Sequence, residues 1–248
     1  MEEIDTRQRF YDRYVSTFNE TNAGAAVDDS ESFRRWADAR YLPHFAQHHV
    51  DAAILELGCG HGRMLRYLKS RGYKNVSGID ISSEQVLLAQ NAGLNAAAED
   101  VFDHLRAHPS SYDVIIAIDL VEHFRRDELL DLFSLMRDSL RERGTVLIQT
   151  ANGEGLFPGH IIYGDLTHQT IFNPSSMEQL MRLTAFANIR FAETAPLSNG
   201  LKGTVRSLLW SWLRFSLNFW RKIEAGKTQA IWTENMIVSA TKLTSQAT

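Results

Sequence analysis

The sequence predicts an α/β fold in which a mainly parallel, doubly wound sheet carries helices on both faces. From residue 52 onward, short apolar runs alternate with amphipathic segments five times, which is the pattern of a parallel sheet. The run YDVIIAID at 112–119 is apolar throughout its centre, as expected for a strand that is covered on both faces. We therefore expect a Rossmann-like sheet whose ligand crevice lies at the carboxyl ends of its strands.

Local signals define the elements in chain order. The spacing of apolar residues predicts helices at 5–19 and 31–48, and Gly72 ends a helix over 61–70. Ser82 and Gln85 have the capping-box spacing for the next helix. A helix through residue 183 is expected to begin at the Asn-Pro pair at 173–174, and further helices are expected at 127–142 and 201–223. The seven expected strands, the last of them antiparallel, lie at 52–58, 75–80, 94–100, 112–119, 144–152, 188–194 and 234–242.

The composition is that of a globular protein. The chain has 248 residues, of which 44% are apolar and 23% are charged, so disordered and fibrous classes are excluded. Its formal net charge of −4 argues against nucleic acid as the main partner, because phosphate binding depends on clustered Lys and Arg. We expect an N-terminal helical lid at 1–50 and a main domain at 51–248 that contains a helical insertion at 201–225.

Cysteine usage and the N-terminal sequence indicate the compartment. The single cysteine, Cys59, allows no intramolecular disulfide and suits a reducing environment. The first residues lack the basic and apolar regions of a signal peptide, and no run of about 18 apolar residues is present. We expect a cytoplasmic protein, or one that is peripheral to the inner face of a membrane.

A glycine loop follows the first predicted strand. In the sequence ILELGCGHG, Gly58 and Gly60 allow the backbone to turn tightly and to approach a ligand closely. Asp80 ends the second strand, twenty residues after Gly60, where a carboxylate can accept hydrogen bonds from both ribose hydroxyls. Asp100 ends the third strand and can accept a hydrogen bond from an adenine amino group. The loop and its acidic residues therefore predict a nucleotide-like ligand.

Two classes of nucleotide compete for this loop. A dinucleotide fingerprint would place its third glycine at the position of Arg63, where the helix N-terminus meets a pyrophosphate. The glycines run G-x-G-x-G instead, and Glu56 lies inside the preceding strand. A pocket that contains Glu56, Asp80 and Asp100 and no fixed cation suits a ligand with an ammonium and a sulfonium. We therefore predict S-adenosylmethionine as the cofactor.

Residues 52–150 resemble the class I S-adenosylmethionine-dependent methyltransferases. The resemblance rests on ELGCGHG, on the acid at position 80, on AED at 98–100 and on YDVIIAIDLVEH. By this resemblance the glycine loop lines the methionine and ribose side of the cofactor, and Asp119 faces the methionine moiety. The cofactor-binding residues that the resemblance implies are Glu56, Gly58, Cys59, Gly60, Asp80, Ile81, Asp100, Val101 and Asp119.

Two histidines lie where a methyl acceptor is expected. Methyl transfer is an in-line displacement, so the protein must align the acceptor and exclude water, and a hydroxyl acceptor benefits from a general base. His123 follows the strand at 112–119, and His168 lies after the fifth strand. Asp165 could orient an imidazole or bind a substrate hydroxyl. We predict that His168 or His123 is the base, with packing or loop-anchoring roles as the alternatives, and that no metal takes part.

The segment at 160–242 loosely resembles methyltransferases of bacterial surface-polysaccharide biosynthesis clusters. The resemblance rests on DLTHQTIFNPSSMEQLMRLTAF and on the helical insertion that follows it. It implies O-methylation of a sugar hydroxyl on a glycan or glycolipid, with FYDRYV, which contains Tyr11 and Tyr14, as part of a lid over the cofactor. Quinol-ring methyltransferases are a more distant resemblance. The alternatives are N-methylation of an amino sugar or small amine, and a module that binds the cofactor without transferring methyl.

The predicted helix at 201–223 is apolar around more than half of its circumference. Val205, Leu208, Trp212, Phe215 and Phe219 share one face, and the segment contains five basic residues and no acidic one. A helix that packs on one neighbour needs a stripe only about 100° wide. We expect this helix to contact an anionic membrane, to form a homodimer interface or a core contact, or to act as a substrate lid.

Overall fold

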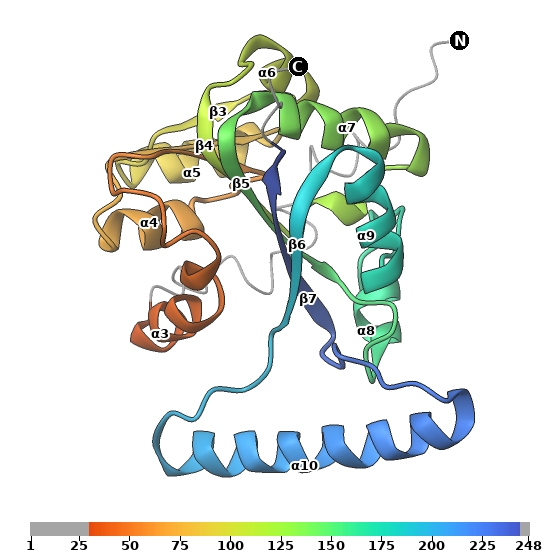
Figure 1. Cartoon of the computed structure of the whole chain (residues 1–248). Helices are drawn as coiled ribbons and strands as arrows, with labels where there is room; N and C mark the ends of the chain where they lie inside the picture. The colour runs from red at the N-terminus through yellow and green to blue at the C-terminus, as the bar shows by residue number, and fades with distance from the viewer. Residues whose placement is uncertain (1–29, 244–248) are drawn as a thin grey trace.

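The computed structural model describes residues 30–243, and its seven strands form one sheet in the order β3-β2-β1-β4-β5-β7-β6 (Figure 1). β1 to β5 are parallel to one another, whereas β7 is antiparallel to both β5 and β6. The predicted fold class is therefore confirmed. The strand bounds are Ala53–Leu57 for β1, Asn75–Asp80 for β2, Ala96–Ala98 for β3, Tyr112–Ile118 for β4, Leu140–Ala151 for β5, Phe186–Glu193 for β6 and Asn235–Lys242 for β7.

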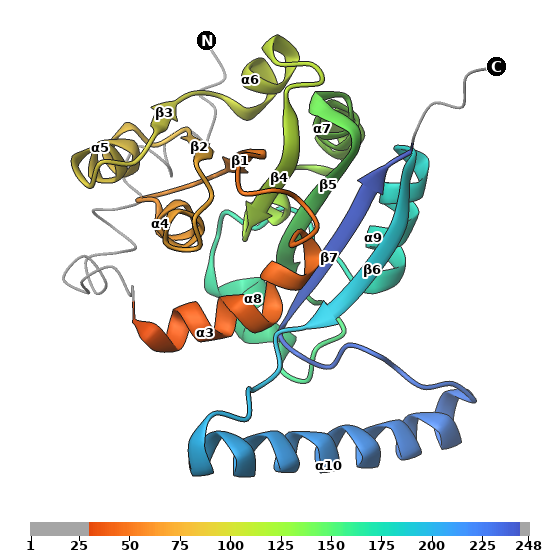
Figure 2. The same ribbon diagram turned by 60° about the vertical axis from the view of Figure 1, so that its left-hand side comes forward.

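Helices cover both faces of this sheet (Figure 2). Apolar residues of α3, α4 and α5 pack on one face, and those of α6, α7 and α9 pack on the other. The helix bounds are Glu31–Arg40 for α3, Arg63–Ser70 for α4, Ser83–Asn91 for α5, Val101–Ala107 for α6, Arg126–Ser139 for α7, Pro158–Gly164 for α8, Pro174–Leu183 for α9 and Gly200–Ala225 for α10, with 3-10 turns η1 at Leu42–His44 and η2 at Val121–His123.

The strand order positions a crevice between β1 and β4. After β1 the chain adds β2 and β3 on one side, and it then crosses back to add β4 and β5 on the other side. The loops that leave the carboxyl ends of β1 and β4 therefore diverge, which leaves room for a ligand between them. This is the edge at which the sequence analysis expects the cofactor.

The predicted helix caps are confirmed, whereas several bounds were wrong. The hydroxyl of Ser82 accepts the backbone N–H of Gln85 at 3.5 Å, and the side chain of Asn173 accepts that of Ser176 at 2.8 Å. The helix expected to continue to residue 48 ends at Arg40, close to Pro43, which cannot donate a backbone hydrogen bond. β5 begins at residue 140 rather than 144, directly where α7 ends, and α6 and α8 were not predicted.

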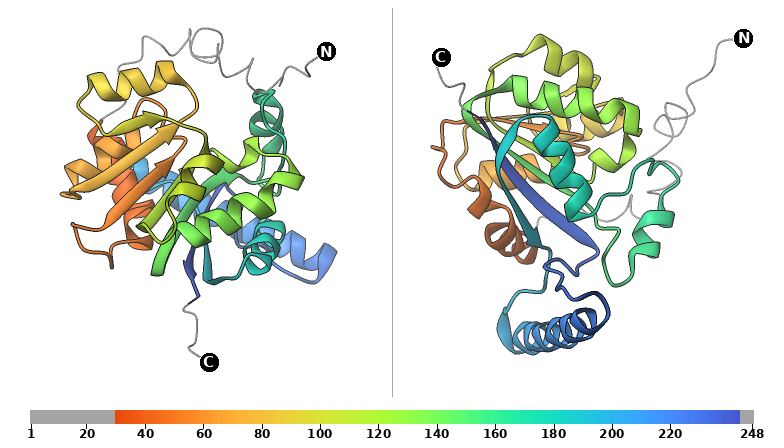
Figure 3. Two further views of the ribbon diagram at one scale, coloured as in Figure 1. Left: turned by 90° about the horizontal axis from the view of Figure 1, so that it is seen from above. Right: turned by 45° about the vertical axis from the view of Figure 1, so that its right-hand side comes forward.

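Helix α10 is the predicted insertion, and it lies apart from the sheet (Figures 1 and 3). Two linkers join it to the end of β6 and the start of β7. Because β6 is parallel to β5, α10 lies beyond the carboxyl edge of the parallel strands. No helix in the described part of the chain is long and apolar enough to cross a bilayer. The helix predicted at 5–19, with Tyr11 and Tyr14, lies outside the described residues.

Candidate active site

The glycine loop holds the acid at the end of β2. Gly58 and Gly60 have φ values of 66° and 51°, a region that glycine enters without steric cost. The N–H of Gly60 donates to Oδ2 of Asp80 at 2.8 Å, and the N–H of Ser82 donates to Oδ1 at 2.8 Å. Burial raises the pKa of the Asp80 carboxyl, and these two donors lower it in part. The carboxylate is thereby fixed at the mouth of the crevice, as predicted.

Two adjoining cavities lie at the carboxyl edge of the sheet. The first, of about 200 Å³, is lined by residues of the loops after β1 to β4, and the second, of about 620 Å³, extends from the glycine loop to α3. Both are lined by Gly58, Gly60 and Asp119, so the two cavities meet at the ends of β1 and β4. An elongated ligand could occupy both.

The first cavity contains the residues predicted to hold the nucleoside. Asp80, Ile81, Asp100 and Val101 all line it. Asp100 also caps α6, because its Oδ1 accepts the backbone N–H of Phe102 at 2.8 Å. Asp100 can therefore cap α6 through Oδ1 and still line the cavity in which a ligand is expected.

The second cavity contains a buried carboxylate that lacks a partner. Glu56 lies within β1, is 4% exposed, and its Oε2 has no hydrogen-bond partner among residues 30–243. Burial, with a smaller contribution from Asp80, raises its pKa well above the ordinary value. An anionic pyrophosphate would be repelled here, whereas an ammonium group would supply the missing donor. Cys59 and Arg63 line the same cavity, so the expectation of a pocket without a fixed cation was wrong: the guanidinium of Arg63, at the start of α4, lies in its wall.

Asp119 is oriented by two residues that the sequence analysis missed. Its carboxylate oxygens accept Nε2 of Gln149 at 3.0 and 3.2 Å, and Oε1 of Gln149 accepts the hydroxyl of Tyr41 at 2.8 Å. Asp119 adopts a φ of 50° directly after β4, and it is exposed to the cavities. Protein atoms surround the carboxyl and exclude much of the water, and this desolvation raises its pKa. Gln149 could have been suspected from the sequence, because it is a polar residue within the apolar part of β5.

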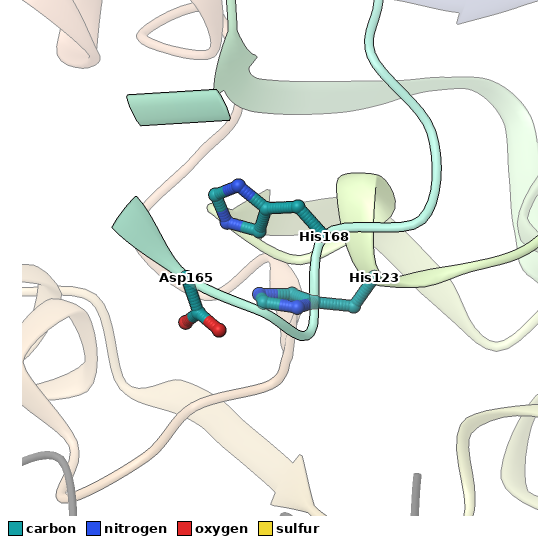
Figure 4. A group of neighbouring side chains, drawn as sticks. All are labelled: His123, Asp165 and His168. Atoms are coloured by element: carbon teal, nitrogen blue, oxygen red, sulfur yellow. The ribbon is translucent and has the colours of Figure 1, made fainter. Parts of the chain in front are cut away.

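His123, Asp165 and His168 converge at this edge of the sheet (Figure 4). The imidazole rings of His123 and His168 meet edge to face, with centroids 5.0 Å apart. His123 lines the first cavity together with Asp119. Nδ1 of His168 is buried and has no hydrogen-bond partner among the described residues. The structure therefore brings together the three residues predicted for catalysis.

Thr167 connects Asp165 to His123. Its hydroxyl donates to Oδ1 of Asp165 at 2.6 Å and lies 2.9 Å from Nδ1 of His123. Because the only hydroxyl hydrogen goes to the carboxylate, Nδ1 of His123 donates to the threonine oxygen. Burial, followed by the neighbouring His168, lowers the pKa of His123 to about 4. Thr167 thus links Asp165 to the imidazole of His123, and the sequence analysis expected Asp165 to orient an imidazole or to bind a substrate hydroxyl.

Glu122 secures the segment that carries His168, and the sequence analysis missed it. Its backbone carbonyl accepts the N–H groups of Gln169 and Thr170 at 2.8 and 3.0 Å, and its carboxyl accepts the hydroxyl of Thr150 at 2.9 Å. Glu122 is 2% exposed, and burial, followed by the nearby Asp119, raises its pKa to about 8. A buried, mostly neutral carboxyl therefore lies directly behind the histidine pair.

The same three side chains have the spacing of a metal site. One ligand atom from each of His123, Asp165 and His168 lies within 4.8 Å of the others. Two imidazoles and a carboxylate are a common ligand set for divalent transition metals. The absence of a metal from the reaction stays a prediction.

Comparison with known proteins identifies a family. The family model described as "Methyltransferase domain" matches residues 29–190, which is more than half of the chain. A ubiquinone biosynthesis O-methyltransferase of Serratia proteamaculans is 32% identical over 79 residues, covering 29% of this chain and 32% of that protein. A tRNA U34 carboxymethyltransferase of Cellvibrio japonicus is 31% identical over 135 residues, covering 49% of this chain and 39% of that protein. The chain thus spans about a third of the length of the curated relatives that it matches.

A solved structure shares the whole fold. The structure described as a SAM-dependent methyltransferase from Archaeoglobus fulgidus superposes with a TM-score of 0.67 at 19% identity. The superposition covers 92% of this chain and all of that one. At this identity the likeness concerns the fold.

Proposed function

The chain belongs to the methyltransferase domain family, as a class I enzyme that uses S-adenosylmethionine, and we propose that it methylates a phenolic hydroxyl of a quinol-type acceptor. The observation that carries the proposal is the meeting of the two cavities at Gly58, Gly60 and Asp119, with His123 in the wall of the first cavity and the ring of His168 packed against that of His123. This arrangement supports cofactor binding, acceptor alignment and proton removal within one crevice.

The residues of both cavities fit the predicted cofactor. S-adenosylmethionine, when bound, supplies an electrophilic methyl group on a sulfonium. Asp80 would accept hydrogen bonds from the ribose hydroxyls, and Asp100 would accept one from the adenine amino group. Glu56 and Arg63 would face the charged ends of the methionine moiety. We propose these roles because each polar group of this chain then meets a group of opposite character.

His168 is the proposed general base. Its unpartnered Nδ1 can accept the proton that a hydroxyl loses as its oxygen forms the new bond to carbon. His123 keeps Nε2 as an acceptor, because its Nδ1 donates to Thr167, but burial lowers its pKa to about 4 and makes it a weaker base than an ordinary imidazole. We assign His123 and Asp165 a positioning role, in which they hold the ring of His168 from its edge.

A phenolic hydroxyl suits this base better than a sugar hydroxyl. The ordinary pKa of a phenol is about 10 and that of an imidazole about 6.5, whereas aliphatic hydroxyls hold their protons more tightly. The second cavity also presents aromatic side chains: the rings of Trp36 and Tyr41 meet at 4.9 Å. The name of the Serratia relative supports the same choice.

Two other acceptor classes have less support. The tRNA-modifying relative covers about half of this chain, but the net charge of −4 does not favour a polyanionic substrate. The sugar hydroxyl predicted from the sequence, and with it a role in polysaccharide biosynthesis, has no support from the relatives described above. A sugar and an amine therefore enter the test as competitors.

The test measures formation of S-adenosylhomocysteine with three acceptors: an alkylated catechol, a nucleotide sugar and a small amine. We expect turnover with the catechol. His168→Ala should lower kcat by roughly 10²–10⁴-fold without changing cofactor affinity measured by calorimetry. His49→Ala is the matched control, because this exposed histidine precedes β1 at the opposite edge of the sheet.

Each competing result has its own signature. Turnover with the sugar or the amine alone would overturn the phenolic acceptor. Near-full activity of His168→Ala at all pH values would overturn the base assignment, and a loss equal to that of His49→Ala would do the same. If calorimetry shows no binding of S-adenosylhomocysteine, the assignment of the two cavities to the cofactor is itself wrong.

A further inference from the structure

The exposed face of α10 is its apolar face. Val205, Leu208, Trp212, Phe215 and Phe219 follow one another at spacings of three or four residues, and between 47% and 74% of each is exposed. A helix on the surface of a globular protein usually directs such a stripe at its neighbour and its polar residues at water. We call these five residues, with Leu201 and Ile223 at the two ends, the outer stripe of α10.

Three polar residues of α10 contact the rest of the protein. The hydroxyl of Ser207 donates to a carbonyl of the preceding linker at 3.0 Å, and Arg214 pairs with Glu193 at 2.9 Å. Asn218 accepts the backbone N–H of Gln229, in the following linker, at 2.8 Å. Because Ser207, Arg214 and Asn218 lie on one side of the helix, these contacts fix its rotation. The outer stripe is thereby left exposed, on a helix that lies apart from the sheet (Figure 3).

Basic residues outnumber acidic ones around the outer stripe. Lys202, Arg206 and Lys222 are exposed beside it, and Glu224, at the last turn, is the only acidic residue of α10. Arg214, one of the five basic residues counted in the sequence, pairs with Glu193 and does not contribute to this face. The exposed surface of the helix is therefore apolar along its middle and basic toward its ends.

We propose that α10 lies in the surface of an anionic lipid bilayer, with its outer stripe at the acyl boundary. Its 26 residues extend about 39 Å, which suits a helix parallel to the membrane plane. Trp212 and Trp220 are both exposed, and tryptophan favours the interface between acyl chains and headgroups. Lys202, Arg206 and Lys222 would meet the lipid phosphates.

The charges favour a lipid surface over a second copy of the chain. In an antiparallel pair of α10 helices, Lys202 and Arg206 of one copy would lie beside Lys222 of the other. In a parallel pair each basic residue would lie beside its own counterpart. Both arrangements bring like charges together next to an apolar seam, and Glu224, the single acidic residue of α10, is too few to offset three basic ones.

A groove beneath α10 is consistent with the same orientation. Leu209, Trp210 and Leu213 of the helix line a groove of about 470 Å³. Thr194 and Asn235 line both this groove and the second cavity. Helix α10 and the second cavity therefore lie on the same side of the molecule. The proposal of membrane contact itself does not depend on which acceptor is methylated.

Flotation of the full chain with lipid vesicles tests the proposal. The vesicles are phosphatidylcholine alone and phosphatidylcholine containing phosphatidylglycerol. Trp212→Glu/Phe215→Glu alters the outer stripe, and Lys202→Glu/Arg206→Glu/Lys222→Glu reverses the flanking charges. The matched control, Leu87→Glu/Leu88→Glu, changes two exposed apolar residues of α5, which are 56% and 52% exposed.

We expect the wild-type protein and the α5 control to float with the anionic vesicles, and the outer-stripe variant to lose at least about tenfold of the floating fraction. The charge variant should lose the preference for anionic lipid. Calorimetry with S-adenosylhomocysteine verifies that each variant is folded, so failure of docking is separable from failure of the proposed function. Absence of flotation of the wild type would overturn the proposal. So would equal flotation of the outer-stripe variant, or a dimer in sedimentation that this variant abolishes.

Discussion

Replacing Gly60 by alanine should separate backbone strain from loss of cofactor binding. The residue has a φ of 51°, and a Cβ built on it meets nothing closer than Oε1 of Gln85 at 3.8 Å, so the added methyl group projects into the first cavity without a clash in the protein. Left-handed backbone costs an L-residue about 1–2 kcal/mol, which for a chain of this size lowers Tm by roughly 2–8 °C. The same methyl group occupies space that we propose for the cofactor.

Gly72→Ala is the matched control. Gly72 has a φ of 89°, and no described atom lies within 4 Å of the position that its added Cβ would take. It lies in the turn after α4, outside both cavities. Both variants should show a similar fall in Tm by calorimetry. Only Gly60→Ala should weaken S-adenosylhomocysteine binding by tenfold or more, which corresponds to about 1.4 kcal/mol. If both variants bind it within about twofold of the wild type, the glycine loop does not hold the cofactor.

Three further predictions concern buried groups around the site. The pKa of Glu122, raised to about 8 in the folded chain, lies above its unfolded value, so its contribution to the free energy of unfolding is full below about pH 4.5 and is lost as pH rises to 8. Glu122→Gln should therefore flatten the pH dependence of urea unfolding between pH 6 and 8.5, and an unchanged slope would contradict the burial argument. Tyr41→Phe leaves the side-chain oxygen of Gln149 without its donor at 2.8 Å, which should lower the free energy of unfolding by about 1–3 kcal/mol in urea titrations, whereas no change would mean that water replaces the hydroxyl. Burial raises the pKa of the Cys59 thiol, so iodoacetamide should modify it slowly at pH 8 in the native chain and rapidly in urea; equal rates would show that the second cavity is open to the reagent.

The parts of the fold and site that depend on local sequence could be predicted. β1 and β4 are mainly apolar runs that end at a glycine or an acid, and β2 ends at Asp80, so Asp80 and Asp119 could be located at strand ends from the sequence. The tight turn after β1 could be predicted from the spacing of Gly58 and Gly60. The α3 helix was predicted too long, because the effect of Pro43 on the helix end was not weighed against the amphipathic pattern.

The remaining site residues depend on contacts between distant segments. Tyr41 and Gln149 are 108 positions apart, and no periodicity relates them before the sheet is assembled. The role of Thr167 depends on the meeting of η2 with the segment after α8, which brings together residues 44 positions apart. The pattern of α10 likewise predicted an apolar stripe but not its direction, because the direction is set by the pairing of Arg214 with a carboxylate at the end of β6.

Thr194 and Asn235 connect the linkers of α10 to the wall of the second cavity. These residues stand at the roots of the two linkers, where the chain leaves β6 and enters β7, and the hydroxyl of Thr194 donates to the carbonyl of Asn235 at 3.2 Å. Both residues also form part of the cavity wall. We therefore expect a tilt of α10 to act, through its two linkers, on the wall of the second cavity, so that the orientation of the helix influences the width of that cavity.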